Sequence, residues 1–173
     1  MYRHYNNMNR NSYRSTGNAQ QKMSASAVPA AVQSARPASA DHGPEPYVLN
    51  IEVATLRNPN YRTAIWTGEN LQATLMSIPA GESIGLELHA DHDQFLRIEA
   101  GQGLTQMGPT QEHLMYEQVV HNGDAIFVPA GMWHNVTNTG HTPLKLYSIY
   151  APAQHPWGTV HHTKAEAEAA EQK

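Results

Sequence analysis

Residues 81–101 read GESIGLELHADHDQFLRIEAG, and this stretch decides how the rest of the chain is interpreted. Residues 84–89 (IGLELH) and 94–99 (QFLRIE) are apolar runs of strand length that polar side chains interrupt. Side chains alternate along a strand, so Glu87 and His89 fall on one face, and Gln94 opens the following strand. A carboxylate and an imidazole on an inward face are costly unless they are paired or bind a cation.

A second stretch, residues 123–138 (GDAIFVPAGMWHNVTN), carries another polar residue of this kind. His134 follows the turn Pro129-Ala130-Gly131 and the apolar Trp133. If the strands are neighbours, Glu87, His89, Gln94 and His134 can converge on one point. Two imidazoles and a carboxylate form a ligand set for divalent iron, manganese, nickel or zinc, and the Gln94 carbonyl would be a fourth, weaker ligand.

The spacing in these two stretches resembles the two motifs of the cupin family. The first motif is a Gly, a His-x-His pair, a Glu and a Gly, and its spacing is reproduced at Gly81, Glu87-Leu88-His89, Gln94 and Gly101. The second motif is matched at Gly123, Pro129, Gly131, His134 and Asn138. The resemblance implies an all-β, double-stranded β-helix (jelly-roll) barrel over residues 47–160, with a divalent metal at its open end. The chain is also similar to small RmlC-like cupins, including those grouped with mannose-6-phosphate isomerases.

Two residues depart from the first motif of the family. Glu87 stands where the family has a His, and Gln94 stands where it has a Glu. Carried over residue by residue, the implied metal ligands are Glu87, His89, Gln94 and His134. One carboxylate survives at a different position, so the formal charge of the ligand set is unchanged. The alternative is a metal-free pocket in which Glu87 and Gln94 hydrogen-bond to each other and to water.

Further short apolar runs flank these stretches, with Gly, Pro and Asn between them. Strands are expected at residues 62–67, 71–78, 103–107, 113–119, 125–128, 133–137 and 144–150. This pattern is typical of a sandwich or small barrel and not of alternating βαβ units. One or two helical turns are expected at 50–57, and Thr163–Glu166 fits a capping box that opens a short C-terminal helix, so that 161–173 forms a helix and tail.

The first 46 residues differ in composition from the rest of the chain. They contain no Ile, Leu, Phe or Trp, so they cannot bury enough apolar surface to offset the entropy of ordering them. We therefore expect residues 1–46 to form a disordered arm with a charge of +3, attached to a body whose charge is −7. The arm is interpreted either as an assembly element or as a solvated leader without a partner.

Composition excludes several classes of protein. The 173 residues include no cysteine, which rules out disulfides and thiolate metal sites. A net charge of −4 argues against a nucleic-acid partner, and no apolar run is long enough to cross a bilayer. The N-terminus lacks the apolar stretch of a secretory signal. We therefore expect a cytoplasmic protein without membrane or nucleic-acid partners.

Eleven histidines are unusual for this length. His92 lies in the loop 90–93 and is, with Glu87, a candidate acid–base catalyst, or otherwise a polar turn residue. The remaining histidines are expected mostly in solvent: His113, His121, His141, His155, His161 and His162. The pocket walls are expected to include Met76, Leu96, Trp133 and Tyr147, unless these residues simply fill the core.

Two functions fit these observations. The first is a metal-dependent cupin enzyme of the isomerase, dioxygenase or lyase type, which acts on a small oxygen-bearing molecule. The second is a non-enzymatic cupin that binds a ligand or builds a coat-like assembly through the arm. Both lead us to expect a homodimer, by analogy with other single-domain cupins.

Overall fold

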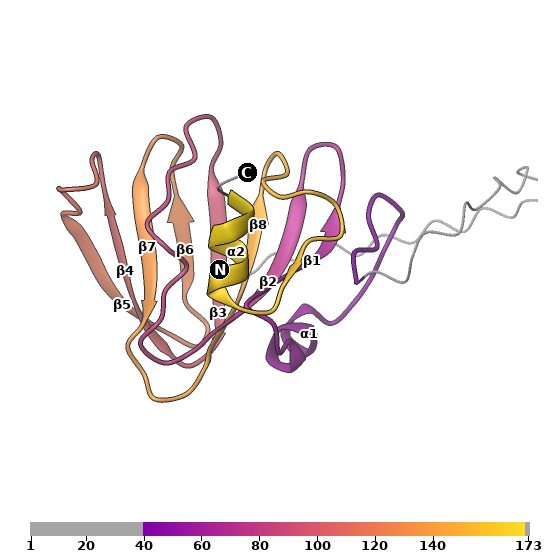
Figure 1. The fold of residues 1–173 in the computed structure, drawn as a ribbon, viewed down its shortest axis with the longest axis horizontal. Coiled ribbons are helices and arrows are strands. Elements are labelled where there is room, and N and C mark those ends of the chain that lie inside the picture. The colour runs from indigo at the N-terminus through magenta and orange to yellow at the C-terminus, as the bar shows by residue number, and fades with distance from the viewer. Residues whose placement is uncertain (1–39, 172–173) are drawn as a thin grey trace, which may run out of the picture. The chain divides into compact units, whose positions relative to one another are not determined.

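A computed structural model describes residues 40–171. In this part of the chain the strands form two antiparallel sheets that face each other (Figure 1). The larger sheet has the order β6 (Ala125–Val128), β3 (Gln94–Ala100), β8 (Leu144–Tyr150), β2 (Gln72–Ile78), β1 (Arg62–Thr67) and β9 (Val160–His161). The smaller sheet has the order β5 (Tyr116–His121), β4 (Gln102–Gly108) and β7 (Trp133–Asn138). This is the all-β jelly roll that the sequence predicts.

Alternation along the strands sorts side chains between the inside and the outside of the jelly roll. In β8 every second residue is buried, from Leu144 to Tyr150. In β7 the buried residues are His134, Val136 and Asn138, so polar side chains share the inner face with apolar ones. The interior therefore contains an apolar part and a polar part.

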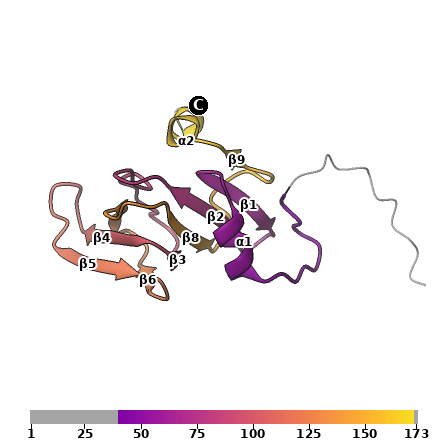
Figure 2. The same ribbon diagram turned by 90° about the horizontal axis from the view of Figure 1, so that it is seen from below.

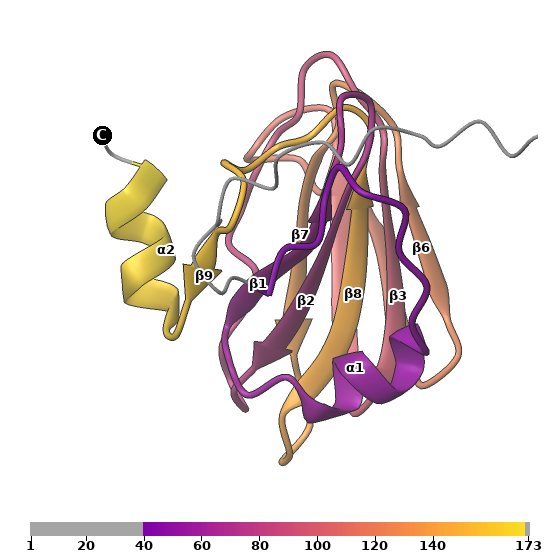
Figure 3. The same cartoon turned by 90° about the vertical axis from the view of Figure 1, so that its right-hand side faces the viewer.

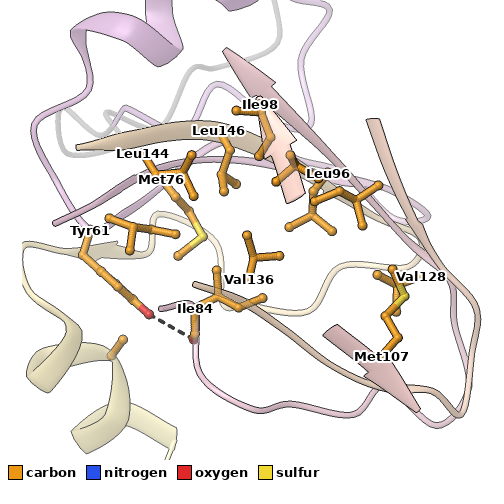
Figure 4. Close-up of a cluster of buried hydrophobic side chains, with 14 residues drawn as sticks. Tyr61, Met76, Ile84, Leu96, Ile98, Met107, Val128, Val136, Leu144 and Leu146 are labelled. Atoms are coloured by element: carbon orange, nitrogen blue, oxygen red, sulfur yellow. Dashed lines mark hydrogen bonds between the residues drawn. The ribbon is translucent and has the colours of Figure 1, made fainter. Parts of the chain in front are cut away.

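The apolar part is a cluster of side chains from both sheets (Figure 4). Met76, Leu96, Leu146 and Val136 are almost completely buried in it. Each such side chain contributes about 1.5–3 kcal/mol through burial. Tyr61 closes one side of the cluster, because its hydroxyl donates to the carbonyls of Ser83 and Ile84 at 2.9 and 3.0 Å. This contact holds Tyr61, the residue before β1, against the segment that leads to Glu87 and His89.

The helix α1 (Ile51–Arg57) lies across the outer face of the larger sheet (Figure 3). Asn50 caps its N-terminus, since the side-chain oxygen accepts from the Val53 N–H at 3.0 Å. Ile51 and its neighbours pack on a second apolar cluster that includes Ile65 and Leu75. The helix expected at 50–57 is therefore present, and it covers an apolar sheet face.

The C-terminal segment lies on the other side of β1 from α1, with β9 leading into α2 (Lys164–Glu171) (Figure 2). Thr163 caps α2 by accepting from the Glu166 N–H at 3.3 Å, as the capping box predicts. The Glu166 carboxylate, however, accepts from the His162 N–H and not from Thr163. Ala167 of α2 belongs to the apolar core, so this helix closes one side of the interior.

Two expected strands need correction. Residues 84–89 contain only one isolated bridge, between Glu87 and His134, because Gly85 adopts a φ of +98° that breaks a regular strand. The strand expected at 113–119 runs instead from Tyr116 to His121, after a turn in which His113 N–H donates to Thr110 O at 3.2 Å. The short strand β9 was not expected.

The end of the predicted arm also differs from the structure. Asp41 is buried, and its carboxylate accepts hydrogen bonds from Thr67 Oγ1 at 2.6 Å and from the Gly158 N–H at 2.9 Å. Residues 40–46 therefore pack on the jelly roll, whereas the rest of the predicted arm, residues 1–39, lies outside the described residues, as does the end of the C-terminal tail. Across residues 40–171, no helix combines the length and the apolar character that a bilayer crossing requires.

Candidate metal centre

Three side chains converge inside the jelly roll: Glu87, His89 and His134. One potential ligand atom of each lies within 4.8 Å of the other two. His134 comes from β7, whereas Glu87 and His89 come from the irregular segment between β2 and β3. Both imidazoles are buried, and the Glu87 side chain retains 19% of its exposure. Solvent therefore reaches this cluster on the side of Glu87.

Backbone hydrogen bonds place these residues together. Glu87 and His134 form an isolated antiparallel bridge, in which each N–H donates to the other's carbonyl at 3.0 Å. Residues directly opposite in such a bridge project to the same side. The carbonyl of His89 accepts from the Gly131 N–H at 2.8 Å, which holds His89 beside the turn before β7. Glu87 and His89 thus share a face as expected, although no regular strand produces it.

Gln94 and Ser148 set the orientation of the polar groups behind His134. The Ser148 hydroxyl donates to the Phe95 carbonyl at 3.3 Å, so its oxygen accepts from Gln94 Nε2 at 2.9 Å. Gln94 Oε1 is then directed at His134 Nε2, 2.7 Å away. The Gln94 amide is hydrogen-bonded to Ser148 and His134 and not to Glu87, so this network differs from the metal-free arrangement considered above.

The ring of His134 has oxygen atoms at both of its nitrogens. Nδ1 lies 3.1 Å from the Met132 carbonyl oxygen, whereas Nε2 lies 2.7 Å from Gln94 Oε1 and 3.6 Å from Glu87 Oε1. All three oxygens can only accept, so a neutral imidazole, which has one N–H, satisfies only one side of the ring, and with the proton on Nδ1 the lone pair of Nε2 faces two oxygen atoms. The lone pairs of these nitrogen and oxygen atoms repel one another unless a cation lies among them. In addition, a metal-ligating histidine commonly donates its other ring N–H to a backbone carbonyl, the position that the Met132 carbonyl occupies here.

The donor atoms of Glu87 and His89 also have the positions expected of metal ligands. Glu87 Oε2 lies 3.9 Å from His89 Nε2, and both Glu87 Oε1 and His89 Nε2 are buried without a hydrogen-bond partner. Two ligands of one zinc-like ion lie roughly 3–3.5 Å apart, close to these separations. Burial lowers the pKa of His89, although Glu87 opposes this, so the imidazole is neutral near pH 7 and has a free lone pair. The donor set therefore fits a divalent cation.

A family model described as the cupin domain matches residues 74–150. This chain belongs to the cupin family.

Three known proteins resemble this chain over longer stretches. The uncharacterized protein YrkC of Bacillus subtilis is 60% identical over 131 residues, which cover 76% of this chain and 70% of YrkC. Protein L612 of Acanthamoeba polyphaga mimivirus is 42% identical over 115 residues, or 66% of this cupin and 70% of L612. The crystal structure of BH2720 from Bacillus halodurans has a TM-score of 0.74 and 62% identity, and the match covers 75% of this cupin and 98% of BH2720.

His92 occupies an unexpected place in this cupin. Its ring is buried and stacks on His89, with centroids 4.7 Å apart and an interplanar angle of 20°. Its Nδ1 lies 2.8 Å from the exposed carboxylate of Asp91, and this hydrogen bond lowers the pKa of Asp91. His92 is therefore more than a polar turn residue: it is buried against one of the three converging side chains.

Several residues beside the centre were missed or misplaced by the sequence analysis. His155 was expected in solvent, yet it is partly buried, and burial together with Arg62 lowers its pKa to about 3. Arg62 and Tyr150 are fully buried near the centre and were not singled out. The expected wall residues Met76 and Leu96 belong to the apolar core, while Tyr147 packs with the outer cluster under α1.

An apolar groove of about 680 Å³ lies between the edges of the two sheets, at β5 and β6. Its walls include Met115, Val119 and Phe127, and its floor includes Met107 and Met132. Met107 is the register partner of His134 across β4 and β7, so the groove abuts the β7 side of the interior. The residues that line it do not include any member of the converging triad.

Proposed function

We propose that this cupin binds a divalent metal through Glu87, His89 and His134, and that it uses the metal to bind a small oxygen-bearing molecule. The observation that carries the proposal is the convergence of three donor side chains at the centre, where Glu87 Oε1 and His89 Nε2 are buried without a hydrogen-bond partner. Gln94 Oε1 is the fourth candidate ligand, because Ser148 turns it toward His134. Two imidazoles with oxygen ligands suit manganese, iron, nickel or zinc.

Each residue of the centre has a distinct task in this proposal. His89 and His134 supply neutral nitrogen ligands, and the Met132 carbonyl holds the His134 ring in the required tautomer. Glu87 supplies the negative charge and lies at the solvent-accessible side, where a ligand would enter. When bound, a divalent ion supplies Lewis acidity to an oxygen atom of the ligand. This role is compatible with isomerase, dioxygenase or lyase chemistry, with His92 as the candidate acid–base group; Glu87 is the other candidate only if it does not bind the metal.

Metal analysis of the purified, tag-free chain tests the proposal. The chain is stripped with a chelator, loaded with Mn²⁺ or Zn²⁺, desalted and analysed by mass spectrometry. We expect about one ion per chain for the natural sequence and a loss of at least about tenfold in metal affinity for His134→Ala. His121→Ala, at an exposed histidine on β5, is the matched control and should bind as the natural chain does.

Adventitious binding is separated by a second variant. His161 and His162 are adjacent near α2, so a chain carrying both His161→Ala and His162→Ala should retain its metal. Unchanged stoichiometry in His134→Ala, or loss of metal only in this double variant, would contradict the proposal. The rival role in assembly depends on the arm of residues 1–46, of which 1–39 lie outside the described residues. This role stays a prediction, as does the homodimer.

A further inference from the structure

A second polar cluster adjoins the candidate metal centre. Its central member is Arg62, the first residue of β1, which is 1% exposed. Among the described residues it is the only lysine or arginine that is buried. The cluster also contains Tyr150 at the end of β8, His155 in the following loop, and His161 on β9, which is the register partner of Arg62.

The cluster is continuous with the metal centre through the ring of Tyr150. The Tyr150 ring contacts the His89 ring, at a centroid distance of 5.6 Å, and it also contacts the His155 ring, at 5.2 Å. Both contacts are T-shaped, with interplanar angles of 89°. Burial lowers the pKa of the Arg62 guanidinium, but Tyr150 and then Glu87 oppose this, and the net shift is upward. The two clusters therefore share one interior.

The positive charge of Arg62 is incompletely paired. Its Nη1 donates to Glu171 Oε1 at 3.4 Å, but the Glu171 side chain is 59% exposed at the end of α2. Nε of Arg62 is buried and has no hydrogen-bond partner. A buried guanidinium normally uses several of its five N–H groups, and an unused one favours an additional acceptor.

The neighbouring groups are neutral and can donate. The Tyr150 hydroxyl is buried and has no hydrogen-bond partner, so its O–H is available to donate. His155 and His161 have lowered pKa values because of burial and Arg62, so each is a neutral imidazole. His155 Nε2 and His161 Nδ1 are buried and have no hydrogen-bond partner. One fixed positive charge surrounded by neutral hydrogen-bonding groups is complementary to an oxyanion with one negative charge.

We propose that Arg62, with Tyr150 and His155, forms a carboxylate-binding subsite, and that the ligand of this cupin is a small organic acid. Its carboxylate would lie against Arg62 Nε while another oxygen faces Glu87, His89 and His134. A carboxylate is favoured over a phosphate, because phosphate sites generally use several cations and this cluster buries one. The inference deepens the proposed function and rests on it.

Calorimetry on the full-length chain tests the subsite. The probes are acetate, glycolate and malonate, with inorganic phosphate for comparison, each titrated into chelator-treated and Mn²⁺-loaded protein. We expect at least one of the three carboxylates to bind the loaded chain, and Arg62→Met to weaken that binding at least about tenfold. The Mn²⁺ content of Arg62→Met should equal that of the natural chain, because Arg62 is not a ligand. Arg97→Met, at an exposed arginine on β3, is the matched control and should bind normally.

Further variants keep the test decisive. If Arg62→Met fails to fold, His155→Phe preserves the ring contact with Tyr150 and should weaken carboxylate binding severalfold. Tighter binding of phosphate than of the carboxylates, undiminished carboxylate binding in a folded variant, or no binding of any carboxylate to Mn²⁺-loaded protein would overturn the inference. Failure of the natural chain to take up Mn²⁺ would instead contradict the proposed function, and Arg62-dependent carboxylate binding to the chelator-treated chain would then still support the subsite.

Discussion

Ser148 controls the candidate centre without belonging to the triad. Its hydroxyl accepts from Gln94 Nε2 and donates to the Phe95 carbonyl, and this chain of hydrogen bonds turns Gln94 Oε1 toward His134. Without Ser148 the Gln94 amide could rotate and present an N–H to His134 Nε2. The metal would then lose Gln94 Oε1 as a ligand and would face the partly positive NH₂ group of the Gln94 amide.

We therefore expect Ser148→Ala to lower the affinity for Mn²⁺ or Zn²⁺ by about 10–100-fold, the usual effect of losing a supporting hydrogen bond. Competition with a metal-sensitive dye measures the change. Ser77→Ala, on the neighbouring strand β2, is the matched control and should leave the affinity unchanged. An affinity for Ser148→Ala equal to that of the natural chain would show that the orientation of Gln94 does not matter.

At the residue scale, the candidate ligands were predictable and the groups beside them were not. Glu87, His89 and His134 interrupt apolar runs at motif spacing, so their types and positions point to a common centre. Arg62 is the first residue of a strand, and His155 lies beside Pro156 in a loop. Charged and polar residues at such positions are usually solvated, so nothing in the sequence indicated that they would lie inside. Their burial depends on the C-terminal segment, which no local pattern places. Alternation in 144–150 would have placed Tyr150 inward with Leu144 and Leu146.

At the scale of elements, most strands were predictable because alternation and Gly, Pro or Asn punctuation coincide. The segment 84–89 was assigned wrongly, since the apolar alternation there gave no sign that Gly85 would adopt a positive φ. The irregular backbone nevertheless places Glu87 opposite His134 through two hydrogen bonds. The pairing of Glu87 with His89 was therefore right, but the regular strand invoked to explain it was wrong.

The loop after β8 is positioned by one buried amide of β2. Gln72 Nε2 donates to the His155 carbonyl at 2.8 Å, and its Oε1 accepts from the N–H groups of Gln154 and His155 at 3.2 and 2.9 Å. Gln72 is completely buried. The sheet thus fixes the backbone of a loop, and the loop places the His155 imidazole against Tyr150.

At the scale of the whole molecule, buried neutral histidines make folding sensitive to acid. His155 has a pKa of about 3 in the folded chain, against 6.5 as its ordinary value, because burial and Arg62 disfavour the imidazolium. Between these two pKa values, His155 binds a proton in the unfolded chain but not in the folded chain. Stability from this group is fully present above about pH 6.5 and is lost as the pH falls toward the folded value.

For the chelator-treated chain, we expect His155 to reduce the free energy of unfolding by about 2 kcal/mol between pH 6.5 and pH 5. Urea unfolding at several pH values measures it. His155→Phe should remove this share of the pH dependence, whereas His141→Phe, at an exposed histidine, should retain it. The same pH slope in His155→Phe as in the natural chain would mean that the buried imidazole does not resist protonation.

The metal centre and the Arg62 cluster lie in one interior, which the two sheets, the irregular segment 84–89 and the C-terminal segment with β9 and α2 enclose together.

The most direct test of the metal centre is an anomalous difference map from crystals of the full chain grown with Mn²⁺ or Zn²⁺. We expect one strong peak at about 2.0–2.2 Å from Glu87, His89 and His134. A map without a peak among these three side chains, or with metal only at His161 and His162, would contradict the proposal.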